Sequence, residues 1–290
     1  MPKTFSIFTA NCSMSVSIAS LNSGSNGNCY YIGGEAGGIL IDVGISCKET
    51  EIRMARLGLS LHSIKAIFVS HEHTDHIKGI AVLARKYQIP VYLNQTMIYN
   101  GCVNVQRELT RKYEAHTPVM VAGLEVTSFP KYHDACDPHS FVIRSGGITI
   151  GVMTDIGRVC EQVVKYFNMC DAVFLEANYD VEMLEKGRYP YYLKNRIRSG
   201  RGHLSNNEAL ELFIGHRSAS LSHVLLSHLS KDNNCPDLVY RLFHAHAGDA
   251  EVVVASRFNE SAIFHIGKSE VCSEVKESLP VYQTQFSLFE

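Results

Sequence analysis

The stretch AIFVSHEHTDHIKGI, residues 66–80, decides how the sequence is interpreted. It begins with a short apolar run of the kind that forms a buried strand and continues directly into His71, His73, Asp75 and His76. Successive residues of an extended segment point to opposite sides, so His71 and His73 share one side and Asp75 continues it. A turn into a helix that starts at His76 would bring this histidine round to the others.

Imidazole and carboxylate groups are the usual protein ligands of zinc, manganese and iron. A polar loop with incidental histidines is the alternative interpretation, but this spacing directly after a strand is far less expected by chance. One ion rarely takes four ligands from six consecutive residues. The stretch therefore predicts half of a site for two adjacent divalent ions, Mn²⁺ or Zn²⁺, with iron as a further option.

The same pattern, an apolar run that ends abruptly in a polar residue, recurs along the chain. The runs GGILIDVG, ITIGVMTDIG, DAVFLEAN and HVLLSHLS reach Asp42, Asp155, Glu176 and His228. Most runs precede a helical pattern, expected at residues 47–56, 76–87, 158–168 and 206–216. In layered α/β folds the carboxyl ends of the strands meet at one place, so these polar residues are expected to gather there.

The pattern predicts one α/β domain of mixed sheets flanked by helices over residues 14–266, followed by a tail over residues 267–290. A hairpin is expected around Gly146–Gly147. The composition is that of an ordinary globular protein: 290 residues, 46% hydrophobic, 19% charged and a formal net charge of −2.

No apolar run approaches the roughly 20 residues that cross a bilayer, and the first residues, MPKTFSIFTANCSMS, do not resemble a signal peptide. The nine cysteines are odd in number and contain no CxxC pair. This usage favours reduced thiols over a disulfide framework. A cytoplasmic protein without membrane association is expected.

Two ions need ligands from other strand ends, and His133, Asp155 and His228 are the candidates. Asp155 could bridge, because the two oxygens of a carboxylate can face different ions. His139 competes with His133, and His133 is preferred because it closes an apolar strand pattern.

The HxHxDH motif, a later histidine, the aspartate of TDIG and the histidine of LLSHLS together resemble the metallo-β-lactamase fold superfamily, over about residues 16–266. The resemblance implies an αββα sandwich with the site at its top edge. It also implies the ligand sets: His71, His73 and His133 on one ion, Asp75, His76 and His228 on the other, and Asp155 between them. Asp42 of LIDVG matches a motif that lies beneath the metals and supports their ligands.

Two stretches suggest how a phosphate is bound. LNSGSNGNCYYI, residues 21–32, is a loop whose backbone N–H groups could cradle an anion; a simple hairpin turn is the alternative. RSGRGHLSNNEALELF places His203 before a helix capped by Ser205, with Glu208 at the capping-box position, and helix N-termini attract phosphate. His203 resembles a ribonuclease Z histidine that serves the scissile phosphate or the leaving group; a plain capped helix is the alternative. Arg201 stands where this element is expected to have an acidic or small residue.

A third stretch, KGRYPYYLKNRIRSGR at residues 186–201, carries six cations interleaved with tyrosines and has no acidic residue. Cations follow a phosphate backbone and aromatic faces stack on unpaired bases, so this basic strip predicts a nucleic-acid surface; a solvated helix face is the alternative. The candidate substrate-binding residues are Ser23, Ser25, Asn26, Asn28, Asn178, Tyr192, Lys194, Arg196, Arg198 and Ser205.

Together SGSNGN, HEHTDHIKG, HDACDP, TDIG, LEANYDVEML, KGRYPYYLKNRI, GHLSN and SHLSKDNN resemble the YycJ/WalJ branch of the superfamily. The resemblance implies a nuclease with 5′→3′ exonuclease action on DNA, a role in DNA repair or maintenance, and Asp75 and His203 as catalytic residues. Single-stranded DNA or DNA 5′ ends are then the expected partners, with RNA as an alternative. The rival interpretation is an ester, thioester or lactone hydrolase of the same fold. Such an enzyme would need no basic strip, so the strip favours the nuclease.

The tail ends in QTQFSLFE. Gln285, Phe286, Leu288 and Phe289 resemble a short peptide with which bacterial replication and repair proteins bind the sliding clamp, and an exposed terminal peptide with apolar anchors suits such docking. A tail that packs on its own domain is the alternative.

Overall fold

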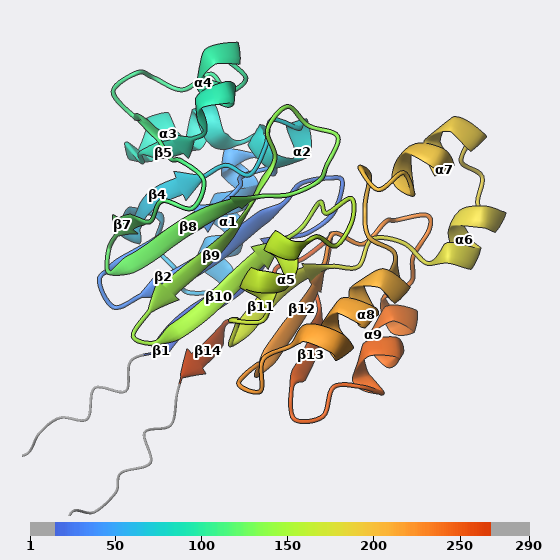
Figure 1. The fold of residues 1–290 in the computed structure, drawn as a ribbon. Helices are drawn as coiled ribbons and strands as arrows, with labels where there is room; N and C mark the ends of the chain where they lie inside the picture. The colour runs from blue at the N-terminus through green and yellow to red at the C-terminus, as the bar shows by residue number, and fades with distance from the viewer. Residues whose placement is uncertain (1–14, 268–290) are drawn as a thin grey trace, which may run out of the picture.

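The protein forms two seven-stranded sheets packed face to face between layers of helices (Figure 1), and the computed structural model describes residues 15–267. In the first sheet the order is β14 (Phe264–Gly267), β1 (Ser15–Asn22), β2 (Cys29–Gly34), β3 (Gly37–Ile41), β4 (Ile64–Phe68), β5 (Val91–Leu93) and β6 (Thr110–Lys112). In the second it is β13 (Glu251–Val254), β12 (His223–Ser227), β11 (Ala172–Glu176), β10 (Ile148–Met153), β9 (His139–Ser145), β8 (Leu124–Pro130) and β7 (Val119–Val121).

The helices of the described chain are α1 (Cys47–Arg56), α2 (Thr74–Ile77), α3 (Ile80–Tyr87), α4 (Gln95–Asn100), α5 (Glu161–Phe167), α6 (Val181–Lys186), α7 (Tyr191–Ile197), α8 (Asn206–His216) and α9 (Pro236–His244). In Figure 1, α5, α8 and α9 cover the second sheet, and α6 and α7 stand away from the sandwich. The predicted αββα architecture is confirmed. The predicted clamp-binding residues Gln285, Phe286, Leu288 and Phe289 lie outside the described residues.

The core between the sheets is built from their inward-facing apolar side chains. Tyr30 of β2 meets Phe174 of β11 with ring centroids 4.8 Å apart, and Phe68 of β4 meets Phe141 of β9 at 5.9 Å. All four residues are almost completely buried, and aromatic pairs in such tilted or edge arrangements add to the stabilisation from burial. These contacts fix the two sheets against each other.

Parallel pairing sets where the strands end. In the first sheet β3 runs parallel to β4, and in the second β10, β11, β12 and β13 run parallel to one another. The carboxyl ends of parallel neighbours reach the same edge of a sheet. The residues that directly follow β3, β4, β10 and β12 therefore gather at one edge of the sandwich.

Two of the four expected helices have the predicted bounds, α1 and α8, and the expected hairpin joins β9 to β10. Gly146 and Gly147 both have positive φ, 56° and 76°, as the tight turn of a two-residue hairpin requires.

The helix expected at residues 76–87 divides instead into α2 and α3. Between them Gly79 donates its N–H to Val43 at 2.8 Å, and a Cβ at Gly79 would lie 2.0 Å from the carbonyl oxygen of Ile45. The close approach of this neighbouring loop interrupts the helix. The helix expected at residues 158–168 begins only at Glu161, because the backbone of the preceding residue, Cys160, is still extended with φ −131° and ψ 170°.

Candidate metal centre

The segment that follows β4 brings its histidines together with one from the second sheet. His71 Nε2 lies 3.1 Å from His73 Nδ1, and His133 Nε2 lies 3.3 Å from the same His73 atom. His71 and His133 are buried and His73 is partly exposed. These nitrogens lie close enough to share one metal ion, and their role as ligands stays a prediction.

The other predicted ligands meet next to this group. His76 Nε2 lies 3.2 Å from Asp155 Oδ2 and 3.7 Å from Asp75 Oδ2. His228 Nε2 lies 3.7 Å from the same Asp75 oxygen, and His228 Nδ1 lies 2.9 Å from Asp155 Oδ1. Asp155 Oδ1 also lies 3.9 Å from His133 Nε2, so this carboxylate stands between the two groups. We call all seven predicted ligands together the His/Asp cluster.

His139, the competitor of His133, lies outside the His/Asp cluster. It is buried, and its Nδ1 contacts the backbone oxygen of Asp137 at 3.1 Å while its ring meets the edge of Tyr113. The preference for His133 therefore agrees with the geometry.

Two buried atoms test whether the cluster suits metal ions. Within residues 15–267, Asp155 Oδ2 and His228 Nε2 are buried without a hydrogen-bond partner. Buried polar groups are normally satisfied, and here the unsatisfied atoms are a carboxylate oxygen and an imidazole nitrogen that face other ligand-type atoms. This donor set, imidazole and carboxylate only, is one that zinc, manganese and iron accept. The cluster fits divalent metal ions.

Charge and burial divide the histidines into two kinds. Burial lowers the pKa of His71 well below its usual value and that of His133 to about 4. Burial would also lower the pKa of His228, but Asp155 and Glu176 outweigh it and raise this pKa to about 10. His76 likewise has a pKa well above its usual value, because nearby carboxylates led by Asp155 outweigh its burial.

Asp42, the residue expected to support the ligands, is completely buried beside the cluster. Its carboxylate accepts hydrogen bonds from the Ser70 N–H at 2.8 Å and the Ser70 hydroxyl at 2.7 Å, and its Oδ2 lies 2.7 Å from His76 Nδ1. This contact fixes the ring of His76 so that Nε2 faces Asp75 and Asp155.

Three residues of the site, each within two positions of the end of a strand, share an unusual backbone conformation. Asp42, Asp155 and His228 have φ of 59°, 54° and 57°, in the left-handed region that residues with a Cβ rarely adopt. Such a conformation persists only where the surroundings fix it. The turn redirects each side chain from the sheet into the site.

Glu176 is a site residue whose role sequence reasoning missed. It is completely buried at the end of β11, and its Oε1 lies 2.8 Å from His203 Nδ1 and 3.1 Å from His228 Nδ1. Burial opposes ionisation, but His203 and His228 lower the pKa of Glu176 to about 2. The polar end of DAVFLEAN was the available signal. Lys131, buried with its amine donating to the Thr154 oxygen at 2.6 Å, was also missed, and its sequence context gave no signal.

Several predicted substrate-binding residues instead hold other parts of the site. The Ser23 hydroxyl accepts the N–H of His228 at 2.7 Å, and Asn28 Nδ2 lies 3.0 Å from His76 Nε2. The Asn178 amide donates to the His228 oxygen at 2.7 Å, and Ser205 caps α8 in the predicted capping box. All four are buried. Ser25 and Asn26, in the same loop as Ser23 and Asn28, are exposed, so direct contact with substrate stays a prediction for the exposed pair.

The basic strip occupies the end of α6, α7 and the loop that follows. Arg196 pairs with Asp134 and Arg198 with Glu185, while Lys194 donates to the backbone oxygen of Glu185 at 2.5 Å. These carboxylates, Asp134 far away in sequence and Glu185 directly before the strip, offset part of the positive charge expected there. Tyr192 is 74% exposed and could stack on a base.

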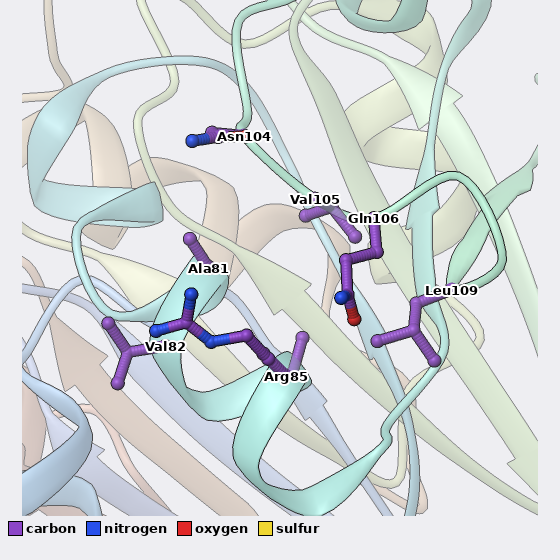
Figure 2. A pocket seen from close by; sticks show the side chains of 8 residues that line it. Ala81, Val82, Arg85, Asn104, Val105, Gln106 and Leu109 are labelled. Carbon is purple, nitrogen blue, oxygen red and sulfur yellow. The ribbon is translucent and has the colours of Figure 1, made fainter.

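A separate cavity of about 350 Å³ lies between α3 and the segment at residues 104–109 (Figure 2). Its lining mixes the polar side chains of Arg85, Asn104 and Gln106 with apolar ones that include Val82 and Leu109. None of the predicted site residues lines it. No helix within residues 15–267 is both long and apolar enough to cross a bilayer.

Comparison with known sequences decides the family, because the β-lactamase superfamily domain matches residues 38–232. The chain belongs to the metallo-β-lactamase superfamily. It is 35% identical over 228 residues to the Bacillus anthracis protein named exodeoxyribonuclease YycJ, covering 78% of this chain and 86% of that one. It is 31% identical over 245 residues to exodeoxyribonuclease WalJ of Streptococcus pneumoniae, covering 82% and 90%.

Among solved structures, the metallo-β-lactamase fold protein YhfI of Bacillus subtilis superposes with a TM-score of 0.68 at 15% identity, covering 87% of this chain and 99% of that one. The predicted resemblance to the YycJ/WalJ branch is confirmed. Membership of this superfamily makes the chain a metal-dependent hydrolase.

Proposed function

We propose that the protein is a two-metal phosphodiesterase that acts on nucleic acid, most simply as a 5′→3′ exonuclease on DNA in repair or maintenance. The observation that carries the proposal is the convergence of the His/Asp cluster with His203, in a chain that shares 35% identity with a protein named as an exodeoxyribonuclease. The structures compared support the fold, and the proposed substrate rests on these relatives.

In this proposal His71, His73 and His133 would hold one ion, Asp75, His76 and His228 would hold the other, and Asp155 would serve both. Divalent ions bound at such a site, Mn²⁺ or Zn²⁺, lower the pKa of water and offset charge on a phosphate. Asp42 orients His76 through its Nδ1, and Glu176 orients both His203 and His228.

His203 is the proposed general acid. Its side chain is 20% exposed, and its ring lies between those of His133 and His228, with centroids 5.2 and 5.0 Å away. Because Nδ1 contacts the Glu176 carboxylate, Nδ1 donates this hydrogen bond and Nε2 is left for the substrate. As general acid, His203 would act as the imidazolium: Nε2 would give its proton to the departing 3′ oxygen, which leaves a neutral ring with its Nδ1 proton hydrogen-bonded to Glu176 and a free 3′ hydroxyl.

The direct test is cleavage of 5′-phosphorylated, end-labelled DNA and RNA by metal-stripped protein supplied with Mn²⁺ or Zn²⁺. We expect stepwise loss of nucleotides from the 5′ end of DNA. Hydrolysis of small esters without any cleavage of nucleic acid would refute the proposal and favour the rival small-molecule hydrolase.

Replacing His203 with alanine should lower kcat by different factors on two substrates. A nucleotide 3′ oxygen is a poor leaving group that needs a proton, whereas p-nitrophenolate leaves without one. We expect His203→Ala to lower kcat on an oligonucleotide about 100-fold or more, and on bis(p-nitrophenyl) phosphate less than about tenfold. Equal losses on both substrates would show that His203 does not act as the acid.

Metal binding should release protons. In the metal-free protein the pKa values of His76 and His228 are raised, the latter to about 10, so both rings are protonated at neutral pH. Their ionic contacts with Asp155 are present below that pKa and are lost as the pH rises through it. A metal ion must displace these protons, so its affinity should increase with pH. Calorimetric titrations with Zn²⁺ in two buffers of different ionisation enthalpy should give different heats, and identical heats would contradict the assignment.

A further inference from the structure

Two adjoining cavities open beside His133, outside the proposed chemistry. The first, of about 510 Å³, is lined by His133, Tyr132, Arg158 and Arg201 among others, and the second, of about 630 Å³, shares Tyr132 and Arg158 with it. We call this feature the Tyr132 groove and define it by Tyr132, Arg158 and Arg201. It leads directly to a predicted metal ligand.

The walls of the groove come from three segments held together at Gly157. The Gly157 N–H donates to the backbone oxygen of Tyr132 at 2.5 Å. A Cβ at Gly157 would lie 2.5 Å from the Cα of Arg201, so the loop before α8 packs tightly on this glycine. The groove is therefore part of the folded frame and is not a gap between independent loops.

One wall carries a stacked cation and aromatic ring. The guanidinium carbon of Arg158 lies 3.8 Å from the ring centroid of Tyr132, and Tyr132 remains 43% exposed. Guanidinium planes and tyrosine rings are both surfaces on which unpaired bases stack. The pair offers a flat platform next to the metal centre.

The arginines of the groove differ from those of the basic strip. Within residues 15–267, neither Arg158 nor the Arg201 side chain forms an ion pair or hydrogen bond with another residue, even though Asp137 and Glu161 also line the cavities. Arg196 and Arg198, by contrast, each pair with a carboxylate. Cations without a protein partner are the ones left to neutralise a phosphate.

We propose that the Tyr132 groove binds the single-stranded end of DNA on its way to the metal centre, with a base stacked on Tyr132 and Arg158 and with phosphates on Arg158 and Arg201. This inference rests on the proposed function and adds the path of the strand. It also gives Arg201, the departure from the expected pattern, a specific role. A cavity of this size admits a base with its phosphate, whereas a duplex exposes no base face for stacking.

Binding is measured by fluorescence anisotropy with a labelled single-stranded oligonucleotide, in a His73→Ala background so that cleavage does not interfere. We expect Arg158→Ala/Arg201→Ala to raise Kd about tenfold or more and to reduce the slope of log Kd against log salt by about one to two. Tyr132→Leu should raise Kd about fivefold or more with little change in that slope, because the ring contributes stacking and no charge.

The control is a double variant outside the groove. Lys48→Ala/Arg241→Ala removes two exposed cations that line neither cavity. It should stay within about threefold of the parent, because salt screens exposed charges outside the binding site. An effect of this variant as large as that of the groove variant would overturn the proposal, as would parental Kd in the groove variant. Tyr132→Leu should change the Kd for blunt duplex DNA little. If the variant loses as much affinity for the duplex as for the single strand, Tyr132 does not act by stacking on a base.

Cleavage separates this inference from the proposed function. If the protein with His73 intact cleaves DNA while groove variants bind as the parent does, only the groove is wrong. If the intact protein cleaves no nucleic acid, the proposed function is wrong. If the His73→Ala parent also fails to bind the oligonucleotide, the proposal that the groove binds DNA is wrong as well.

Discussion

His73→Ala is expected to abolish hydrolysis of every phosphodiester while leaving the fold in place. His73 lies within 3.3 Å of both His71 and His133 ring nitrogens, so its loss removes the residue that the first ligand group shares. Because His73 is partly exposed at the start of α2, its removal creates no cavity in the core. Loss of an ion that supplies several kcal/mol lowers kcat about 1,000-fold or more.

The measurement is kcat on an oligonucleotide and on bis(p-nitrophenyl) phosphate, with circular dichroism to check folding. His133→Ala should show the same loss, whereas His139→Ala, which removes a buried histidine outside the His/Asp cluster, should retain measurable turnover. Activity retained by a folded His73→Ala protein would be incompatible with the proposed site.

The second large effect is expected at Asp42. Asp42→Ala removes the acceptor of Ser70 and the partner of His76 in a completely buried position, and it places alanine at φ 59°. When buried groups lose a charged hydrogen-bond partner, the free energy of unfolding falls by about 3–5 kcal/mol. We expect a loss of unfolding free energy of that size in the metal-free protein, measured by urea denaturation, and metal affinity lower by about 10–100-fold.

Asp42→Asn is the matched variant, because asparagine has the same shape and tolerates left-handed φ. It should fold, lose less stability and still bind metal more weakly, since the pKa of His76 depends in part on the Asp42 charge. If Asp42→Asn binds metal as tightly as the natural chain and Asp42→Ala unfolds at the same urea concentration, Asp42 does not support the site.

The fold and the His/Asp cluster could be predicted because each depends on short segments. A buried run that ends in Asp42, His71, Asp155 or His228 predicts both a strand and the position of its carboxyl end. Parallel pairing of neighbouring strands then brings these ends to the same edge of the sheet. The capping box at Ser205 is equally local. Such features do not require knowledge of which distant segments meet.

The remaining features depend on contacts between distant positions. Arg196 pairs with Asp134, which lies 62 positions away, so a strip that is basic in sequence is partly neutral in space. Asn28 belongs to a loop that looked like an anion cradle, yet its amide points inward to His76. Glu176 was seen as a strand end, but only the tertiary fold shows that two histidines converge on it.

The two sheets contribute different halves of the candidate centre: His71, His73 and His76 follow a strand of the first, whereas Asp155 and His228 follow strands of the second. During synthesis the first half is made more than 150 residues before Asp155 and His228 are both present, because His76 and His228 are 152 positions apart. A chain still emerging from the ribosome therefore has ligands but no complete centre. Under the proposed function, hydrolytic activity can begin only after both halves have been made and packed together.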